Sequence, residues 1–600
     1  MAETPLMKQY KEIKSKHEDS ILFFRLGDFY EMFFDDAVKA SKELGLTLTS
    51  RNKEKDMDVP LAGVPYHSAN SYISKLVSKG YKIAICEQVE DPKTAKGIVK
   101  REVTKIITPG TVIDVDTLDA KSNNYLMSIR IAEEKTGIAY IDITTGEFKV
   151  TEIENDKECS GMMNELNKIE PKEVLVTASF YESAKEVLDD YARKNNATVT
   201  CVNKVRDSEK FLTDYFGVVS LESYGIKNKK AVIEAGAMAL DYILTMQIEN
   251  ELTVEKIEYL NVSNYAEINS ITARNLELTK NQREKTVFGS LLWVLDKCKS
   301  SMGTRLLKKY INNPLLDVEK ILKRQQDVQY FIDNILIRED IKEKLENVYD
   351  LERLSGKIVF GNENGKDLTA LKNTVKSAIE IMEILRNTEF FKDIEIQILI
   401  DIYKLIDTGI VEDAPFSVRE GGMIKRGYSS ELDEIYHIMN SGKDFLLEIE
   451  GREREATGIK NMKIKYNKVF GYFIEITKSN LDMVPETYIR KQTLSNAERF
   501  VTPELKKYED TIINSKAKIE DMEYYLFKEI SGKIKEHKSL LIRLAEKLAY
   551  LDVMISFATA AIENGYVRPE ISNEFDMKII EETVFSPFFG IVVVKNSEDT

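Results

Sequence analysis

Short apolar runs and helical spacing alternate near the start of the chain. Residues 21–26 are almost continuously apolar, Gly27 and Asp28 give a turn signal, and residues 35–44 carry apolar positions at helical spacing. A short apolar run bounded by a turn signal is typical of a buried strand, and apolar positions three or four apart are typical of one face of a helix. The pattern predicts a small α/β domain.

After Pro109 and Gly110 the pattern changes to segments in which polar and apolar residues alternate. Residues 125–131, 137–143 and 147–153 alternate in polarity, with turn signals at 135–137 and at Thr145-Gly146. Such spacing predicts an antiparallel meander. Helical stretches and a further strand at 173–176 follow, so we expect a second α/β domain.

Helical periodicity dominates from about residue 229 onward. It runs through 231–247, 291–310 and 371–386. Thr502, Pro503 and Glu504 then supply an N-cap, a proline at the first helical position and an early acid. The helical pattern that they open continues with few interruptions to about residue 564, which favours a long lever or coiled-coil arm.

A short β insertion separates these helical blocks. Residues 463–466 alternate polar and apolar side chains, Asn467 and Lys468 can turn, and residues 471–476 are typical of a returning strand. Because side chains alternate across a strand, Lys463 and Lys465 should share one face. The whole chain is therefore predicted to be multidomain, α/β at the start and mainly α afterwards.

Composition narrows the class of protein. The chain has 600 residues, 43% hydrophobic and 31% charged, which is enough for several separate cores. No apolar run approaches the roughly eighteen residues of a membrane span, and residues 1–20 lack the apolar core of a secretory signal. We therefore expect a cytoplasmic location. The four cysteines are far apart with no CxxC pair, so neither a zinc site nor a disulfide framework is indicated.

The charge distribution is uneven. The net charge of -15 argues against a surface that is basic throughout. Between residues 458 and 491, however, seven bases stand against three acids, a net charge of about +4. These lysines fit two interpretations equally well: a solvated edge hairpin that discourages aggregation, or a surface that contacts phosphates.

The sequence gives only weak support for a nucleotide-binding site, a nuclease site or a nucleophilic catalytic site. Residues 361–367 superficially resemble a P-loop but are one residue short between the glycines, and Asp367 stands where Ser or Thr must reach magnesium. Asp142 and Glu147 could hint at a metal-dependent nuclease, which needs several converging carboxylates. The four histidines are scattered, and no nucleophile with a neighbouring base is visible. We expect no catalytic and no metal-binding residue.

Six aromatic residues crowd one N-terminal stretch: Phe23, Phe24, Phe29, Tyr30, Phe33 and Phe34. Composition alone favours core packing for each of them, Phe29 included, because aromatic rings usually fill cores. By the same reasoning Glu31 would be a solvated or capping acid.

Ordered motifs change that interpretation. They are RLGDFYEMF (25–33), PLAGVPYH (60–67), CEQ (86–88), TPGT (108–111), RNLEL (274–278), MGTRLL (302–307), DLERL (350–354), YNKVFGY (466–472) and RKQTLSNAER (490–499). In this order they resemble the bacterial DNA mismatch-repair family MutS, over about residues 7 to 580. The resemblance implies that Phe29 enters the minor groove and stacks on the mispaired base, and that Glu31 hydrogen-bonds it. Phe23, Phe24 and Phe33 remain expected packing residues.

The resemblance also implies a domain order. It comprises a mismatch-recognition domain (1–112), a ribonuclease-H-like connector without nuclease activity (113–253), helical core and lever segments (254–442 and 503–566), a β clamp (443–502) and the start of an ATPase domain (567–600). The clamp residues implied to contact the DNA backbone are Lys463, Lys465, Asn467, Lys468, Arg490 and Lys491. Expected partners are mismatched duplex DNA, a second copy of the chain and MutL.

One feature of the family is not found in these 600 residues. Members continue from the lever into an ATPase with a Walker A loop, whereas here residues 582–590 replace the expected GRHP-type segment and no GxxxxGK followed by Ser or Thr occurs. ATP and Mg²⁺ belong to the complete family protein. We therefore expect that this chain alone neither binds nor hydrolyses ATP, and that it dimerises weakly. A purely structural coiled-coil protein is the alternative, and it would leave the N-terminal motif unexplained.

Overall fold

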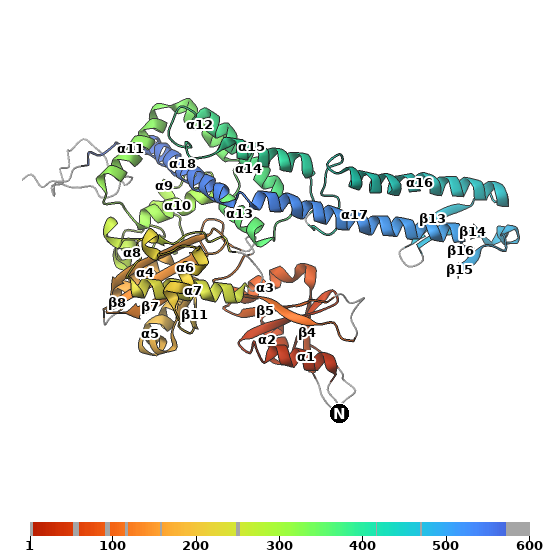
Figure 1. Cartoon of the computed structure of the whole chain (residues 1–600), viewed down its shortest axis with the longest axis horizontal. Coiled ribbons are helices and arrows are strands. Elements are labelled where there is room, and N and C mark those ends of the chain that lie inside the picture. Colours follow the sequence, from red (N-terminus) through yellow and green to blue (C-terminus); the bar gives the residue numbers. More distant parts are fainter. Residues whose placement is uncertain are drawn as a thin grey trace, which may run out of the picture. The chain divides into compact units, whose positions relative to one another are not determined.

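The computed structural model describes residues 4–51, 59–90, 97–113, 118–156, 159–247, 252–415, 417–467 and 471–571 (Figure 1). The chain forms two compact units. The first contains Met1–Asn362, Ser377–Glu395 and His537–Thr600, and the second contains Glu363–Lys376 and Ile396–Glu536. Mixed α/β regions followed by helical ones confirm the predicted multidomain class. Among the described residues, no helix is long and apolar enough to cross a bilayer.

The first unit begins with a six-stranded sheet in the order β3-β4-β2-β1-β5-β6. Its strands are β1 (Ser20–Leu26), β2 (Phe29–Phe33), β3 (Thr49–Arg51), β4 (Val59–Pro65), β5 (Lys82–Gln88) and β6 (Arg101–Ile107). Helices α2 (Phe34–Leu44) and α3 (Ala69–Val77) pack on one face. The other face packs against α1 (Pro5–Lys14) through Tyr10. The predicted strand, turn and helix at 21–44 are confirmed.

A second six-stranded sheet follows, in the order β11-β10-β7-β8-β9-β12. The predicted meander is present as β7 (Leu126–Ala132), β8 (Lys135–Asp142) and β9 (Glu147–Glu154), and β10 (Glu173–Val176) and β11 (Thr198–Cys201) extend it in parallel. The sixth strand is β12 (Glu258–Tyr259). Helices α4 (Ser160–Ile169) and α5 (Ala178–Asn195) cover one face, and α6 (Ser208–Phe216) and α7 (Lys230–Met246) cover the other.

The helical part of the first unit is built around α18 (Lys538–Asn564), which is buried along most of its length. It packs against α10 (Ser301–Asn312), α11 (Val318–Asp333) and α13 (Leu351–Phe360). The other helices here are α8 (Ser270–Asn275), α9 (Leu291–Leu295) and α12 (Ile335–Leu345). The prediction of one helical stretch at 291–310 was wrong, because α9 ends at Leu295 and Ser300 caps a new helix.

Asp552 of α18 holds the start of α10. Its carboxylate is 1% exposed and accepts hydrogen bonds from the Lys299 amide and from the amide and hydroxyl of Ser300. A Cβ added to Gly303 would lie 2.4 Å from this carboxylate, so only glycine fits there. Burial raises the pKa of Asp552 to about 6, although the bonds from Ser300 and Lys299 oppose that rise.

A pH dependence follows from that shift. A carboxyl group whose folded-state pKa lies above its ordinary value of 3.8 stabilises the fold most at low pH and loses that contribution as pH rises towards 6. Between these values, the free energy of unfolding of the parent should fall by up to about 3 kcal/mol relative to Asp552→Asn. Urea unfolding of both proteins at a series of pH values measures the difference, and parallel pH profiles would contradict it.

The second unit contains α15 (Ile396–Gly409), α16 (Ser430–Thr457), α17 (Pro503–Lys535) and a four-stranded sheet. Helix α14 (Gly365–Ile384) runs across the boundary between the units. The predicted start of α17 is confirmed, since the Thr502 hydroxyl accepts from the Leu505 amide at 3.1 Å and Pro503 is the first helical residue. The long helical pattern is broken once, between Lys535 and Lys538.

Candidate nucleic-acid interface

Phe29 stands at the tip of a tight hairpin. Leu26 of β1 pairs with Phe29 of β2, so Gly27 and Asp28 alone make the turn. Gly27 has φ 59°, a left-handed conformation that glycine adopts without steric cost. The Tyr66 amide donates to the Asp28 carbonyl at 2.9 Å, which ties the turn to the end of β4. The sequence thus fixes where the Phe29 side chain leaves the sheet.

Phe29 lies outside the core, although alternation along β2 puts it on the same face as the buried Phe33. The Phe29 ring is 47% exposed, whereas Phe23, Phe24 and Phe33 are each at most 1% exposed. Leu26 and Pro65 are the cross-strand neighbours of Phe29 on either side. Core packing, which composition alone favours for Phe29, is therefore wrong for this ring and right for the three other phenylalanines. Covering such a ring with an apolar partner would stabilise the contact, because apolar surface leaves water.

Glu31 lies on the same side of β2 as Phe29, because they are two residues apart on one strand. It is partly buried and pairs across the sheet with Gly63 of β4. On the opposite face, Tyr30 donates a hydrogen bond to Glu87, and burial together with this carboxylate raises the pKa of Tyr30. Arg25 stacks over the Tyr66 ring at 3.7 Å. These contacts hold the strand beneath Phe29 and Glu31 in place.

The predicted β insertion is a four-stranded antiparallel sheet in the order β13-β14-β16-β15. Its strands are β13 (Lys463–Asn467), β14 (Gly471–Thr477), β15 (Ile489–Thr493) and β16 (Ala497–Val501). The hairpin prediction is confirmed by the register from Lys463↔Glu475 to Asn467↔Gly471. Lys468 lies outside the described residues. One face packs on Ile459, Met462 and Leu505.

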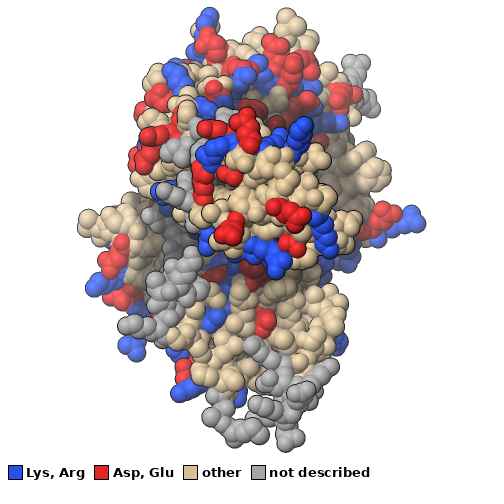
Figure 2. Space-filling model, turned by 90° about the vertical axis from the view of Figure 1, so that its right-hand side faces the viewer, with Lys and Arg blue, Asp and Glu red and all other residues tan. Residues whose placement is uncertain are grey.

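The other face carries charges that are partly neutralised. Lys463 and Lys465 are exposed on it together, as alternation predicts. Glu475 forms ion pairs with Lys465 at 2.7 Å and with Arg499 at 3.4 Å. The hydrogen bond from Lys465 makes the largest contribution to lowering the pKa of Glu475. Two basic side chains of this face are therefore already engaged by one acid. Figure 2 shows lysine and arginine side chains interspersed with acids on the face that it displays.

The remaining basic residues of this sheet differ in their pairing. Arg490 forms an ion pair with Glu498 at 3.4 Å. Lys491 is the extra residue of a β-bulge between Arg490 and Gln492 and is exposed. Within the described part of the chain, neither Lys463 nor Lys491 forms an ion pair, so these two ammonium groups are the most available for an outside anion.

The carboxylates considered for a nuclease are structural. Asp142 is fully buried and accepts from the Asn124 amide at 3.1 Å and from the amide and hydroxyl of Thr144. Burial raises the pKa of Glu147, but Lys309 and Lys149 outweigh it and hold that pKa far below the ordinary value. No group of three or more potential metal ligands occurs among the described residues.

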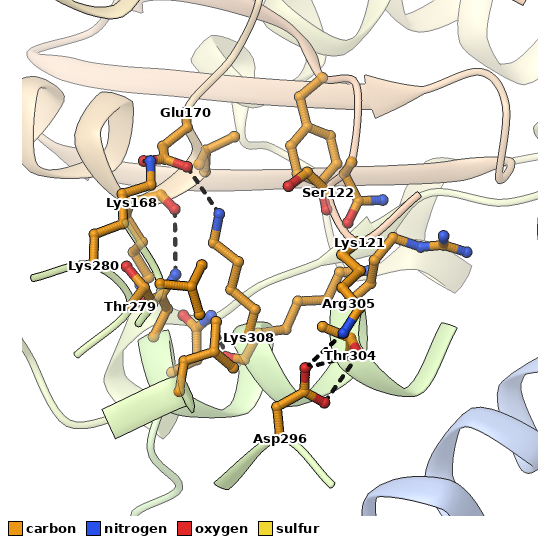
Figure 3. A pocket seen from close by; sticks show the side chains of 18 of the residues that line it. Lys121, Ser122, Lys168, Glu170, Thr279, Lys280, Asp296, Thr304, Arg305 and Lys308 are labelled. Atoms are coloured by element: carbon orange, nitrogen blue, oxygen red, sulfur yellow. Dashed lines mark hydrogen bonds and ion pairs between the residues drawn. The ribbon is translucent and has the colours of Figure 1, made fainter. Parts of the chain in front are cut away.

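A cavity of about 890 Å³ in the first unit lies beside α10, and several of its lining residues are lysines (Figure 3). Lys308 reaches Glu170 at 2.8 Å, and Lys121 reaches Asp296 at 3.2 Å. Glu170 is shared with Lys280, so this carboxylate already serves two lysines. The lining is an ion-paired junction between α10 and the second sheet.

Two arginines from the sequence motifs stabilise the segment beside this junction, a role that the sequence alone did not reveal. Arg305 of MGTRLL is 2% exposed, binds Asp350 through both terminal nitrogens and donates to the Ala120 carbonyl. Arg353 of DLERL is 1% exposed and donates to the Asp119 and Ser122 carbonyls. Both arginines therefore hydrogen-bond to the segment that precedes β7. Their motif spacing gave no sign that they would converge.

Comparison with known proteins assigns these parts. Models of MutS domain I, MutS domain II and MutS domain III match residues 4–116, 124–257 and 271–558. The first sheet, the second sheet, and the helical part together with the second unit thus correspond to three consecutive domains of one class of protein. The chain belongs to the MutS family.

Relatives match nearly the whole chain. The DNA mismatch repair protein MutS of Fusobacterium nucleatum subsp. nucleatum is 53% identical over 577 residues, 95% of this chain and 64% of that protein. Those of Halothermothrix orenii and Alkaliphilus oremlandii are 45% and 43% identical over 96% of this chain, covering 65% and 67% of their own lengths. The chain spans slightly less than two thirds of the length of the first two.

Proposed function

We propose that this chain recognises mispaired bases in duplex DNA, with Phe29 as a minor-groove wedge and Glu31 as a hydrogen-bonding partner of the displaced base. One observation carries the proposal. Phe29 alone among the phenylalanines at 23, 24, 29 and 33 is exposed, on a hairpin held by flanking contacts. A family of DNA mismatch repair proteins supplies the context in which an exposed ring at this position has a use.

The physical basis of recognition is the deformability of the DNA at the mispair, and not the identity of the bases. A mispair weakens stacking locally, so inserting a ring and kinking the duplex costs least at that step. The Phe29 ring replaces part of the lost stacking. Glu31 repels phosphates unless it makes a specific hydrogen bond, and this adds discrimination against matched duplex.

The four-stranded sheet of the second unit is proposed to act as the DNA clamp. Lys463, Lys465, Arg490 and Lys491 would bind phosphates, and the Asn467 amide would join them. Phosphate contacts fix position and add affinity on any sequence. The second sheet of the first unit is interpreted as the ribonuclease-H-like connector, here without nuclease activity. Pairing with a second copy, binding of MutL and use of ATP with Mg²⁺ are proposed for the complete family protein.

The clamp proposal predicts opposite effects for two charge changes on one face. Lys463→Gln removes an ammonium group that no described acid neutralises, so it should weaken binding to matched and mismatched duplex equally and lower the salt slope by about one. Glu475→Gln releases Lys465 and Arg499 from their shared acid and should strengthen binding to both duplexes. Fluorescence anisotropy at several salt concentrations measures the affinities.

Lys404→Gln is the matched control, since Lys404 is an exposed lysine on α15 of the same unit and outside the sheet. It should leave the salt slope at the parental value. A changed mismatch-to-matched ratio in Lys463→Gln, or no change in its slope, would count against the phosphate-binding role.

A further inference from the structure

Gly63 occupies an unusual place in the first sheet. It lies inside β4 and is exposed, with the buried residues Ala62 and Val64 on either side. Glycine weakens a strand interior because it loses more conformational freedom and offers no side chain to pack. A glycine at such a position usually marks a left-handed backbone, a bulge, a close approach of another chain segment, or the approach of a ligand.

The first two reasons do not apply to Gly63. Its φ lies outside the left-handed range, in contrast to that of Gly27. The pairing of β2 with β4 is continuous from Phe29↔Pro65 to Phe33↔Leu61, so no bulge interrupts the strand. The φ of Gly63 therefore does not require glycine.

Close packing within the described chain does not require glycine either. A Cβ built at Gly63 would lie 3.5 Å from the Tyr30 carbonyl oxygen, 3.7 Å from Glu31 Cγ and 4.0 Å from a ring carbon of Phe29, all ordinary contact distances. At Gly137, by comparison, a Cβ would lie 2.1 Å from the backbone of α7. Gly63 therefore leaves open a space that the described chain does not fill.

That space adjoins the two residues assigned to mismatch recognition. Glu31 is the cross-strand partner of Gly63, and the Phe29 ring is the next side chain along the same face. We infer that Gly63 is a specificity-determining residue, whose missing side chain gives the mispaired nucleotide room to lie against Phe29 and Glu31. This inference rests on the proposed function. A base in van der Waals contact sits about 3.5–4.0 Å from its neighbours, so a methyl or isopropyl group here would hold it away from Glu31.

The test is a pair of substitutions that fill the space stepwise. Gly63→Ala should fold with an unchanged or higher melting temperature, because side-chain-bearing residues suit strands better than glycine. It should nevertheless lower affinity for a duplex with one mispair by about fivefold, and Gly63→Val should lower it further. Affinity for the matched duplex should stay at the parental value in both variants. Gly532→Ala is the control, since its added Cβ meets nothing within 4 Å in α17.

The outcomes separate the two claims. A Gly63→Val protein that keeps the parental mismatch-to-matched ratio, or a Gly63→Ala protein that unfolds at a lower temperature, would overturn the inference about Gly63. If the parent shows no preference for the mispair and Phe29→Ala binds as the parent does, the proposed function itself fails, whatever Gly63 does. A folded Gly63→Ala protein with a reduced ratio, beside an unaltered Gly532→Ala protein, supports the inference.

Discussion

Phe29→Ala should abolish the preference for mispaired DNA while leaving the protein folded. Stacking of an aromatic side chain on a base contributes roughly 1–3 kcal/mol, which corresponds to a loss of about 5- to 150-fold in mismatch affinity. Matched duplex offers no weakened stack, so its affinity should change little. Because the ring is 47% exposed, its removal should cost less than the roughly 3–5 kcal/mol expected for a core phenylalanine.

Phe23→Ala is the matched control for this prediction. Phe23 lies on the neighbouring strand β1 and is fully buried, so its truncation should cost about 3–5 kcal/mol of stability. Thermal unfolding and the mismatch-to-matched affinity ratio are measured on both variants. A Phe29→Ala protein that is destabilised as strongly as Phe23→Ala, or that retains the parental ratio, would rule out the wedge.

Arg305→Met should destabilise the protein about as strongly as truncation of a core phenylalanine. Arg305 is 2% exposed and neutralises Asp350 and Glu352, and these two interactions raise its pKa although burial lowers it. Removing the arginine takes away the basic partner of Glu352 and leaves Asp350 with Arg353 alone, and breaking such a buried network costs about 3–5 kcal/mol. The Ala120 carbonyl would also lose its donor, so the segment entering β7 should loosen. Urea unfolding measures the loss.

The control is Arg386→Met, which breaks another arginine–glutamate pair. Arg386 contacts Glu383 at 2.7 Å, but both side chains are about two thirds exposed. An exposed pair contributes at most about 1 kcal/mol, so this variant should unfold almost as the parent does. Equal losses in the two variants would show that burial of the Arg305 network contributes no stability.

Periodicity was sufficient to predict the local elements. An apolar run before a turn signal predicted β1. Alternation and turn signals predicted the meander β7 to β9 and the β13–β14 hairpin, whose strands pair with neighbours near in sequence. The break between α9 and α10 was missed. Ser300 caps α10 with its own side chain, but the acid that anchors this cap, Asp552, comes from α18 far along the chain.

In the candidate site, too, local features could be predicted from the sequence and tertiary ones could not. Alternation from a turn could place Phe29 and Glu31 on one face. Helix α1 covers Phe33 on that same face but leaves Phe29 exposed, and how far α1 reaches along the strand is set by tertiary packing. The partial neutralisation of Lys465 depends on Glu475 and Arg499 meeting across three strands. Gly63 became informative only when its strand register beside Glu31 was known.

The most direct test of mismatch recognition is the affinity of this 600-residue chain for two duplexes that differ only in one mispair, measured at low and at physiological salt. Phosphate contacts are common to both duplexes, so both affinities should fall as salt rises. The ratio should stay in favour of the mispair by at least about fivefold, because stacking and hydrogen bonding set it. Equal affinity for the two duplexes at both salt concentrations would contradict the account.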